Sequence, residues 1–223
     1  MSEFIQYLIQ KNQENSDRLP SLSEMSKELG VSISSLREQM EVARVLGFIE
    51  VKPRTGIRRA PYSFKPAVMQ SLKYAASLGS SYFQHFADLR KHIEAAYWYE
   101  ATLLLTVSDL NEMTALIQRA KEKLNGSPIQ IPSQEHRDLH MVIYQRLNNP
   151  FVLGLLDAYW ELYKAEGMDV YPDIHYLDRV WQYHERIVEA LRDKQFTAGY
   201  QLLMEHMELI YQRSKPDINQ KFE

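Results

Sequence analysis

The sequence predicts a mainly α-helical protein with one small β-hairpin. Short helical patterns occupy residues 3–14 and 21–46, and a strand-like stretch occupies residues 48–60. From residue 66 almost to the end, apolar residues recur with a helical period, and glycine, asparagine and proline separate the helical stretches. No strand pattern appears in that last part. We therefore expect a small N-terminal part that contains the hairpin, followed by an all-α bundle of about seven helices.

The composition is that of a soluble protein with a packed core. The 223 residues suffice for one large domain or two small ones, and 45% of them are hydrophobic. A net charge of −3 argues against extensive coating by nucleic acid but allows a local basic patch. The absence of cysteine excludes disulfides and thiolate metal sites. Because there is no basic signal segment and no apolar run of ~18–20 residues, we expect a cytoplasmic protein without a membrane partner.

The N-terminal helices have the layout of a helix-turn-helix. A short helix ends at Gly30, a residue type that commonly stops helices, and Ser21 or Ser23 can cap its start. Ser32 can cap a longer helix at about 33–46. A short helix, a turn with glycine and a longer helix together predict a helix-turn-helix.

A β-hairpin follows, in the place of the wing of a winged helix. Residues 48–51 predict a short strand, 52–56 a turn and 57–60 a return strand. Basic residues exceed acidic ones by six to three between residues 37 and 59, where a recognition helix and a wing would face DNA phosphates. The six basic residues are Arg37, Arg44, Lys52, Arg54, Arg58 and Arg59.

Seven helices are predicted after a short linker bracketed by prolines. They lie at about residues 66–78, 81–105, 109–125, 133–147, 151–166, 174–192 and 195–214. We therefore expect a winged helix over residues 1–60, a linker over 61–66, a helical effector and dimerisation domain over 67–214, and a flexible tail over 215–223.

Residues 19–60 resemble the winged helix of GntR-type bacterial transcription regulators. The matching features are Leu19-Pro20-Ser21, Glu24, Leu29-Gly30-Val31-Ser32, Leu36-Arg37-Glu38, Gly47 and the wing glycine Gly56. The alternative is another helix-turn-helix module, including one that binds proteins. The resemblance implies a homodimer that binds a palindromic operator in double-stranded DNA, with half-sites about one DNA turn apart.

The chain departs from the GntR pattern at two positions. Ser23 and Ile33 stand where family members usually carry arginines that contact DNA. Arg37 remains, and it can reach a guanine edge or a phosphate, or instead pair with Glu41 one helical turn away. The predicted DNA-contacting residues are Ser32, Ser34, Ser35, Arg37, Arg54, Thr55 and Gly56.

Four histidines lie on inward faces of three predicted helices. His136 and His140 are four positions apart, so they stack on one face of their helix. His184 and His206 each lie in line with apolar residues of a later helix. These four imidazoles could meet around one metal ion, or each could be a core histidine with its own hydrogen-bond partner.

The helical half is similar to the FCD effector domain of the FadR subgroup. Arg90 and Glu94 match its Arg-x-x-hydrophobic-Glu signature. The histidines match a later signature of a carboxylate followed by three histidines, with separations of 4, 44 and 22 positions, but His136 replaces the family's aspartate. The resemblance implies a metal site at His136, His140, His184 and His206. It also implies a small organic acid effector bound partly by Arg90, which could instead pair with Glu94 or Asp88 in its own helix.

Imidazole ligands favour a divalent transition metal, zinc or nickel before others, over magnesium or calcium. Neutral ligands leave the ion its full charge, which favours an anionic effector. A metal-dependent enzyme is the competing class, but Arg137 stands where a zincin helix needs glutamate, and no di-iron pair of Glu-x-x-His motifs is present. We predict a metabolite-responsive transcription regulator that is not an enzyme. A four-histidine enzyme and a regulator with a purely structural metal are the alternatives.

Overall fold

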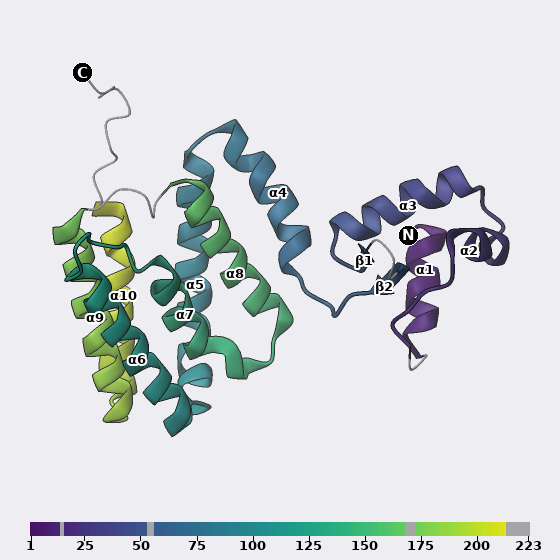
Figure 1. The fold of residues 1–223 in the computed structure, drawn as a ribbon. Helices are drawn as coiled ribbons and strands as arrows, with labels where there is room; N and C mark the ends of the chain where they lie inside the picture. Colours follow the sequence, from purple (N-terminus) through teal and green to yellow (C-terminus); the bar gives the residue numbers. More distant parts are fainter. Residues whose placement is uncertain (14–15, 53–55, 168–172, 213–223) are drawn as a thin grey trace, which may run out of the picture. The chain divides into compact units, whose positions relative to one another are not determined.

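The structure is a computed structural model that describes residues 1–13, 16–52, 56–167 and 173–212 (Figure 1). The chain forms two compact units, Met1–Ser77 and Leu78–Glu223. In the described residues there are ten α-helices and one antiparallel two-stranded hairpin. The predicted mainly α fold with a small wing and a helical bundle is therefore confirmed.

The first unit is a small helical core with a β-hairpin at its end. Its elements are α1 (Glu3–Gln10), the 3-10 turn η1 (Lys11–Gln13), α2 (Leu22–Leu29), α3 (Ile33–Val45), β1 (Ile49–Lys52) and β2 (Gly56–Arg59), and helix α4 (Lys65–Leu78) follows them up to the boundary with the second unit. The first α-helix is shorter than expected, because the chain tightens into η1 after Gln10. Phe4, Met25 and Leu36 are fully buried and hold the helices together.

Serine side chains set the starts of the two helices of the helix-turn-helix. Ser21 forms a capping box with Glu24, whose carboxylate accepts from the Ser21 backbone N–H at 2.7 Å. The Ser32 hydroxyl accepts from the Ser35 backbone N–H at 3.2 Å at the start of α3. Gly30, with φ of +66°, makes the turn between the two helices.

The wing is pinned to the segment that precedes α2. Its strands pair antiparallel, from Ile49 opposite Arg59 to Lys52 opposite Gly56. The Leu19 backbone N–H donates to the Ile57 carbonyl at 2.9 Å, so the chain before α2 lies beside β2 as a third extended segment. The base of the wing is thereby held against the helical core.

The second unit is a bundle built around one long helix. Its helices follow α4 (Lys65–Leu78) and are α5 (Ser81–Leu103), α6 (Val107–Leu124), α7 (Ser133–Tyr144), α8 (Pro150–Ala165), α9 (Ile174–Arg192) and α10 (Phe196–Gln212), with a 3-10 turn η2 (Gln145–Leu147) after α7. Helix α5 packs on α7, α8 and α10, while α9 packs on α6 and α10 (Figure 1). Trp98, Leu139 and Tyr144 are fully buried at the centre. None of the described helices is long and apolar enough to cross a lipid bilayer.

Candidate metal centre

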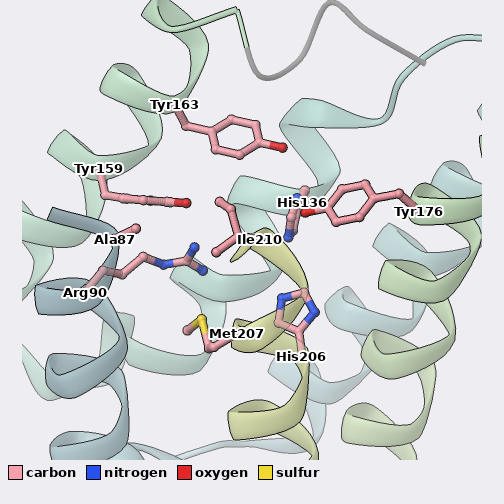
Figure 2. Close-up of a pocket in the computed structure, with 9 residues that line it drawn as sticks. All are labelled: Ala87, Arg90, His136, Tyr159, Tyr163, Tyr176, His206, Met207 and Ile210. Carbon is pink, nitrogen blue, oxygen red and sulfur yellow. The ribbon is translucent and has the colours of Figure 1, made fainter. Parts of the chain in front are cut away.

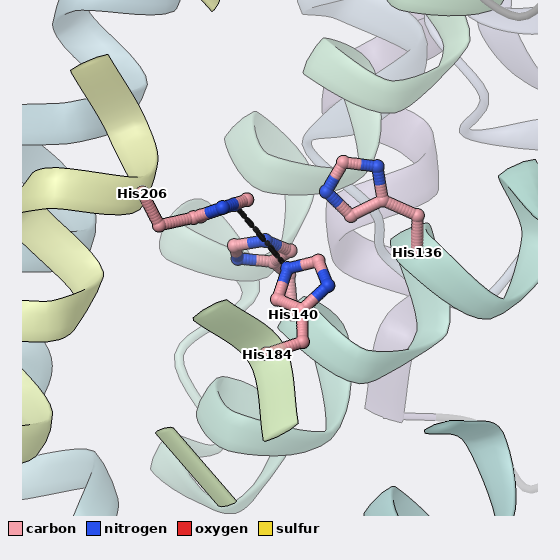
Figure 3. A group of neighbouring side chains, drawn as sticks. All are labelled: His136, His140, His184 and His206. Carbon is pink, nitrogen blue, oxygen red and sulfur yellow. Dashed lines mark hydrogen bonds between the residues drawn. The ribbon is translucent and has the colours of Figure 1, made fainter. Parts of the chain in front are cut away.

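Three helices bring four histidine side chains to one point inside the helical unit (Figure 3). His136 and His140 come from α7, His184 from α9 and His206 from α10. All four are buried, with exposed fractions between 0% and 9%. One possible ligand atom from each lies within 4.8 Å of those of the other three. The four histidines that the sequence singled out thus form one cluster that could hold a metal ion.

The spacing of three ring nitrogens fits a transition metal. The Nε2 atoms of His140, His184 and His206 form a triangle in which every side is 3.2 Å. Two nitrogens that each lie about 2.0–2.1 Å from a tetrahedral zinc ion are about 3.3 Å apart. A neutral imidazole has one N–H to donate, so three Nε2 atoms that face one another cannot all be satisfied among themselves. A shared cation would satisfy all three lone pairs.

His136 is the outlying member of the cluster. The Nε2 atoms of the other three histidines lie 3.2 Å from one another, which is closer than the 4.8 Å that bounds the whole group of four. Its ring packs 4.6 Å from that of Trp160 and 4.7 Å from that of His184, measured between centroids. The trio of His140, His184 and His206 is therefore the compact part of the site, with His136 beside it.

A buried carboxylate orients His140. Glu94 on α5 is fully buried, and its Oε2 lies 2.9 Å from Nδ1 of His140. If this Nδ1 carries the proton, it donates to the carboxylate and leaves the Nε2 lone pair directed at the other histidines, as in carboxylate–histidine–metal arrangements. Burial raises the pKa of the Glu94 carboxyl, and the Arg90 guanidinium opposes this rise. Sequence reasoning associated Glu94 only with Arg90, because a partner 46 positions away leaves no local pattern.

The imidazoles of the triangle are neutral, which is the form that binds metals. Burial lowers the pKa of His140, His184 and His206 well below the usual histidine value, so these rings are neutral at pH 7. The Nδ1 atoms of His184 and His206 are buried and have no hydrogen-bond partner among the described residues. Their Nε2 atoms in the triangle are the only ring nitrogens that contact other polar groups of this part of the chain.

Arg90 lies beside the histidines at a small cavity (Figure 2). Its Nε donates to Glu94 at 2.5 Å, and its guanidinium lies over the rings of Tyr159 and Trp160 at 4.2 and 4.5 Å. Its Nη2 is buried without a hydrogen-bond partner in the described residues. The cavity measures about 20 Å³, enough for about one water molecule. Its lining is Ala87, Arg90, His136, Tyr159, Tyr163, Tyr176, His206, Met207 and Ile210.

The predicted DNA-contacting residues lie in the first unit. Ser32, Ser34 and Arg37 are exposed at the start of α3, while Ser35 is half-buried. Gly56 begins β2 with φ of +81°, a conformation that favours glycine. Arg54 and Thr55 lie outside the described residues.

The alternative partner proposed for Arg37 is occupied by another residue. Glu41 accepts from Arg44 at 2.5 and 2.8 Å, three positions further along α3. Arg37 has no salt bridge within the part of the chain that the structure describes. Its charge therefore faces solvent beside the helix N-terminus.

Comparison with known proteins places the chain in a family. A family model of the FCD domain matches residues 85–209, a stretch that contains all four histidines and Arg90. The chain therefore belongs to the FCD-domain family. A relative that is named as an operon regulator supports its assignment as a GntR/FCD-type regulator.

Three of the similar proteins have low sequence identity to this chain. The Uxu operon regulator of Haemophilus influenzae is 22% identical over 200 residues, which are 86% of this chain and 71% of that protein. A GntR protein of Streptococcus agalactiae superposes over 95% of this chain and 96% of its own, with a TM-score of 0.63 and 16% identity, and so supports the fold. McbR/YncC of E. coli covers 95% of this chain and 99% of its own, with a TM-score of 0.49 and 20% identity.

Proposed function

We propose that the protein is a metabolite-responsive transcription regulator that binds a palindromic operator as a homodimer and receives its signal at a metal centre. The observation that carries this proposal is the 3.2 Å triangle of Nε2 atoms, with Glu94 behind His140. This triangle lies in the stretch that the FCD family model matches, residues 85–209. We assign His136, His140, His184 and His206 as ligands of a divalent transition metal, with zinc or nickel preferred.

The DNA-binding part of the proposal assigns the start of α3 and the wing to the operator. The assignment is supported by the exposed residues Ser32 and Ser34 and by Arg37, which makes no salt bridge to any residue that the structure describes. Ser35, Arg54, Thr55 and Gly56 complete the proposed contact surface. We take residues 1–60 as the DNA-binding domain and 67–214 as the effector and dimerisation domain.

The effector part assigns a small carboxylate to the space beside the metal. A bound ion would keep its full positive charge, since four neutral imidazoles do not reduce it, and it could therefore attract the carboxylate. Arg90 lines the cavity, and its buried Nη2 has no hydrogen-bond partner among the described residues, so it could donate to the second oxygen of a carboxylate. Because the cavity holds only about 20 Å³, effector binding requires the α5, α8 and α10 side chains around it to move apart. Such a movement would couple the site to the bundle through differential affinity for two arrangements.

A purely structural metal is the second candidate. The near-complete burial of the four histidines and the small volume beside them favour it, because a structural site is closed to solvent. In that case the ion would raise the stability of the bundle without changing DNA affinity.

DNA-binding measurements separate these proposals. Fluorescence anisotropy at low salt would use DNA from upstream of the neighbouring genes. Three samples are compared: metal-stripped protein, zinc-loaded protein, and zinc-loaded protein to which organic acids have been added. We expect specific binding whose affinity changes on adding metal and an acid, and an unresponsive His140→Ala variant. Equal DNA affinity under all three conditions would favour the structural metal. No binding at low salt under any condition contradicts the regulator mechanism itself.

A further inference from the structure

A second, larger cleft lies next to the metal centre. It measures about 550 Å³, which is within the usual size range of small-molecule sites. It lies between α7, α8 and the segment that joins α6 to α7. Its deep wall is aromatic, since Trp160 and Tyr163 are only 5% and 6% exposed, and Ile131 adds an apolar side.

The rim of the cleft carries three cationic side chains, two of which are paired with carboxylates. Lys123, Arg137 and Lys164 line it, and no acidic side chain of the described chain does. Lys123 and Arg137 are held in place by carboxylates outside the lining, with Lys123 2.7 Å from Glu135. Lys164 is exposed and makes no salt bridge to another described residue, so its charge is available at the mouth.

The aromatic wall contains an unsatisfied donor. The indole N–H of Trp160 is buried and has no hydrogen-bond partner in the parts of the chain described. Burying a donor without an acceptor is unfavourable, so the surroundings of this indole are not fully satisfied within the described residues. The lining therefore offers a largely buried aromatic wall and one cationic side chain, Lys164, without a carboxylate partner among the described residues.

The same wall separates the cleft from the metal centre. The Trp160 ring lies 4.6 Å from the His136 ring, measured between centroids, and Cζ of Arg90 lies 4.5 Å from the centroid of the Trp160 ring. Tyr163 lines both the cleft and the 20 Å³ cavity at the histidines (Figure 2). A ligand in the cleft would thus contact Trp160 and Tyr163, which pack beside the histidines, without contacting a metal ion held by them.

We infer that this cleft binds a small organic anion with a flat apolar body, such as an aromatic carboxylate, and that it does so without needing the metal. The carboxylate would meet Lys164 at the rim, and the body would lie on Trp160. This site is distinct from the carboxylate position proposed beside the histidines.

The test is a titration of the full-length protein by calorimetry, repeated by ligand-observed NMR. The probes are benzoate and indole-3-acetate, with the uncharged indole-3-acetamide as the ligand control. We expect indole-3-acetate or benzoate to bind with a Kd of about 1 mM or tighter, and indole-3-acetamide at least about tenfold more weakly. Lys164→Glu should weaken binding of the acid about tenfold. The same charge reversal at the exposed residue Lys73 of α4, Lys73→Glu, should change the affinity less than about twofold.

The metal dependence decides between the two carboxylate positions. Binding that persists in metal-stripped protein and in His140→Ala supports the cleft. Binding that disappears on metal removal but survives Lys164→Glu moves the anion to the metal centre and overturns this inference, leaving the proposed regulator intact. Absence of binding by both acids at about 10 mM also overturns it. Metal content and DNA affinity, measured separately, would then still test the proposed function.

Discussion

At the scale of single residues, Glu94 determines how His140 presents its lone pair. The carboxylate is fully buried between Arg90 and His140, so it balances a buried guanidinium and orients a ring of the metal cluster at once. The side chain acts through His140 and is not among the four histidines proposed as ligands.

Glu94→Gln should weaken metal binding about 10–100-fold, because the amide is a poorer acceptor for the His140 N–H and carries no charge. Competition with a chromogenic zinc chelator measures this affinity. Glu100→Gln is the matched control, since Glu100 is exposed on the same helix. Equal affinities for the two variants would show that Glu94 does not orient a ligand.

The environment of Asp109, away from the histidines, predicts that the stability of the fold depends on pH. Hydrogen bonds from Arg146 and from Thr106 lower the pKa of its carboxyl below the usual aspartate value. The folded state therefore binds fewer protons than the unfolded state in mildly acidic solution. The resulting stability is present above the unfolded pKa of about 3.9 and is lost as the pH falls toward the lower folded value.

Asp109→Asn should therefore lower the free energy of unfolding by about 1–3 kcal/mol at pH 7. The difference from the wild type should shrink as the pH falls below about 4. Urea denaturation across this pH range measures it, with exposed Asp178→Asn as the control. A difference independent of pH would mean that the charge of Asp109 contributes nothing.

At the scale of elements, the position of α10 depends on a close contact with α5. A Cβ at Gly199 would lie 2.8 Å from Cζ2 of Trp98, which is fully buried. The Trp98 indole also donates to the Phe196 carbonyl at 2.9 Å, so the ring cannot easily turn away. This contact fixes the helix that carries His206.

Gly199→Ala should destabilise the protein by about 1–3 kcal/mol through overpacking. It should also weaken metal binding, because α10 must shift away from α5. Thermal unfolding with and without zinc measures both effects. Gly79→Ala is the control, since nothing lies within 4 Å of its added Cβ; a similar loss in both variants would contradict the packing argument.

Local patterns predicted the elements well, but long-range contacts only in part. The apolar stripe around His184 predicted a helix at 174–192, and α9 spans Ile174–Arg192. The same stripes turned all four histidines inward. Helix α7 stops earlier than expected because the chain tightens into η2 and then reaches Asn148 with φ of +52°.

The missing parts of the site join residues that are distant in sequence. Glu94 and His140 are 46 positions apart, and the cleft wall at Trp160 meets residues from two other elements. Periodicity indicates which face of a helix is buried, but not which buried side chains meet. The signature shared with the FCD family suggested the ligand set without its supporting carboxylate.

At the scale of the whole molecule, the proposal requires two DNA-binding units on one palindrome. Operator affinity should fall at least about 100-fold between 50 and 200 mM salt, because both units neutralise phosphates. Moving the half-sites apart by about 5 base pairs, half a DNA turn, should abolish the dimer's gain in affinity. Anisotropy titrations on matched DNA duplexes measure both. An operator affinity that does not change with salt concentration or with half-site spacing would contradict binding by two paired units.

Arg37→Ala should weaken operator binding about 10-fold or more, whereas Arg44→Ala should have little effect because Arg44 is engaged with Glu41. The same titrations compare the two variants. Equal losses would indicate that α3 meets DNA only through its overall charge.

The central claim is that the cluster of His136, His140, His184 and His206 holds a transition metal. Elemental analysis of protein purified without chelator and without a histidine tag tests it most directly, with His184→Ala as the comparison. The account predicts about one zinc or nickel ion per wild-type chain and nearly none in the variant. A well-folded wild-type protein that remains free of metal after exposure to excess zinc and nickel would contradict it.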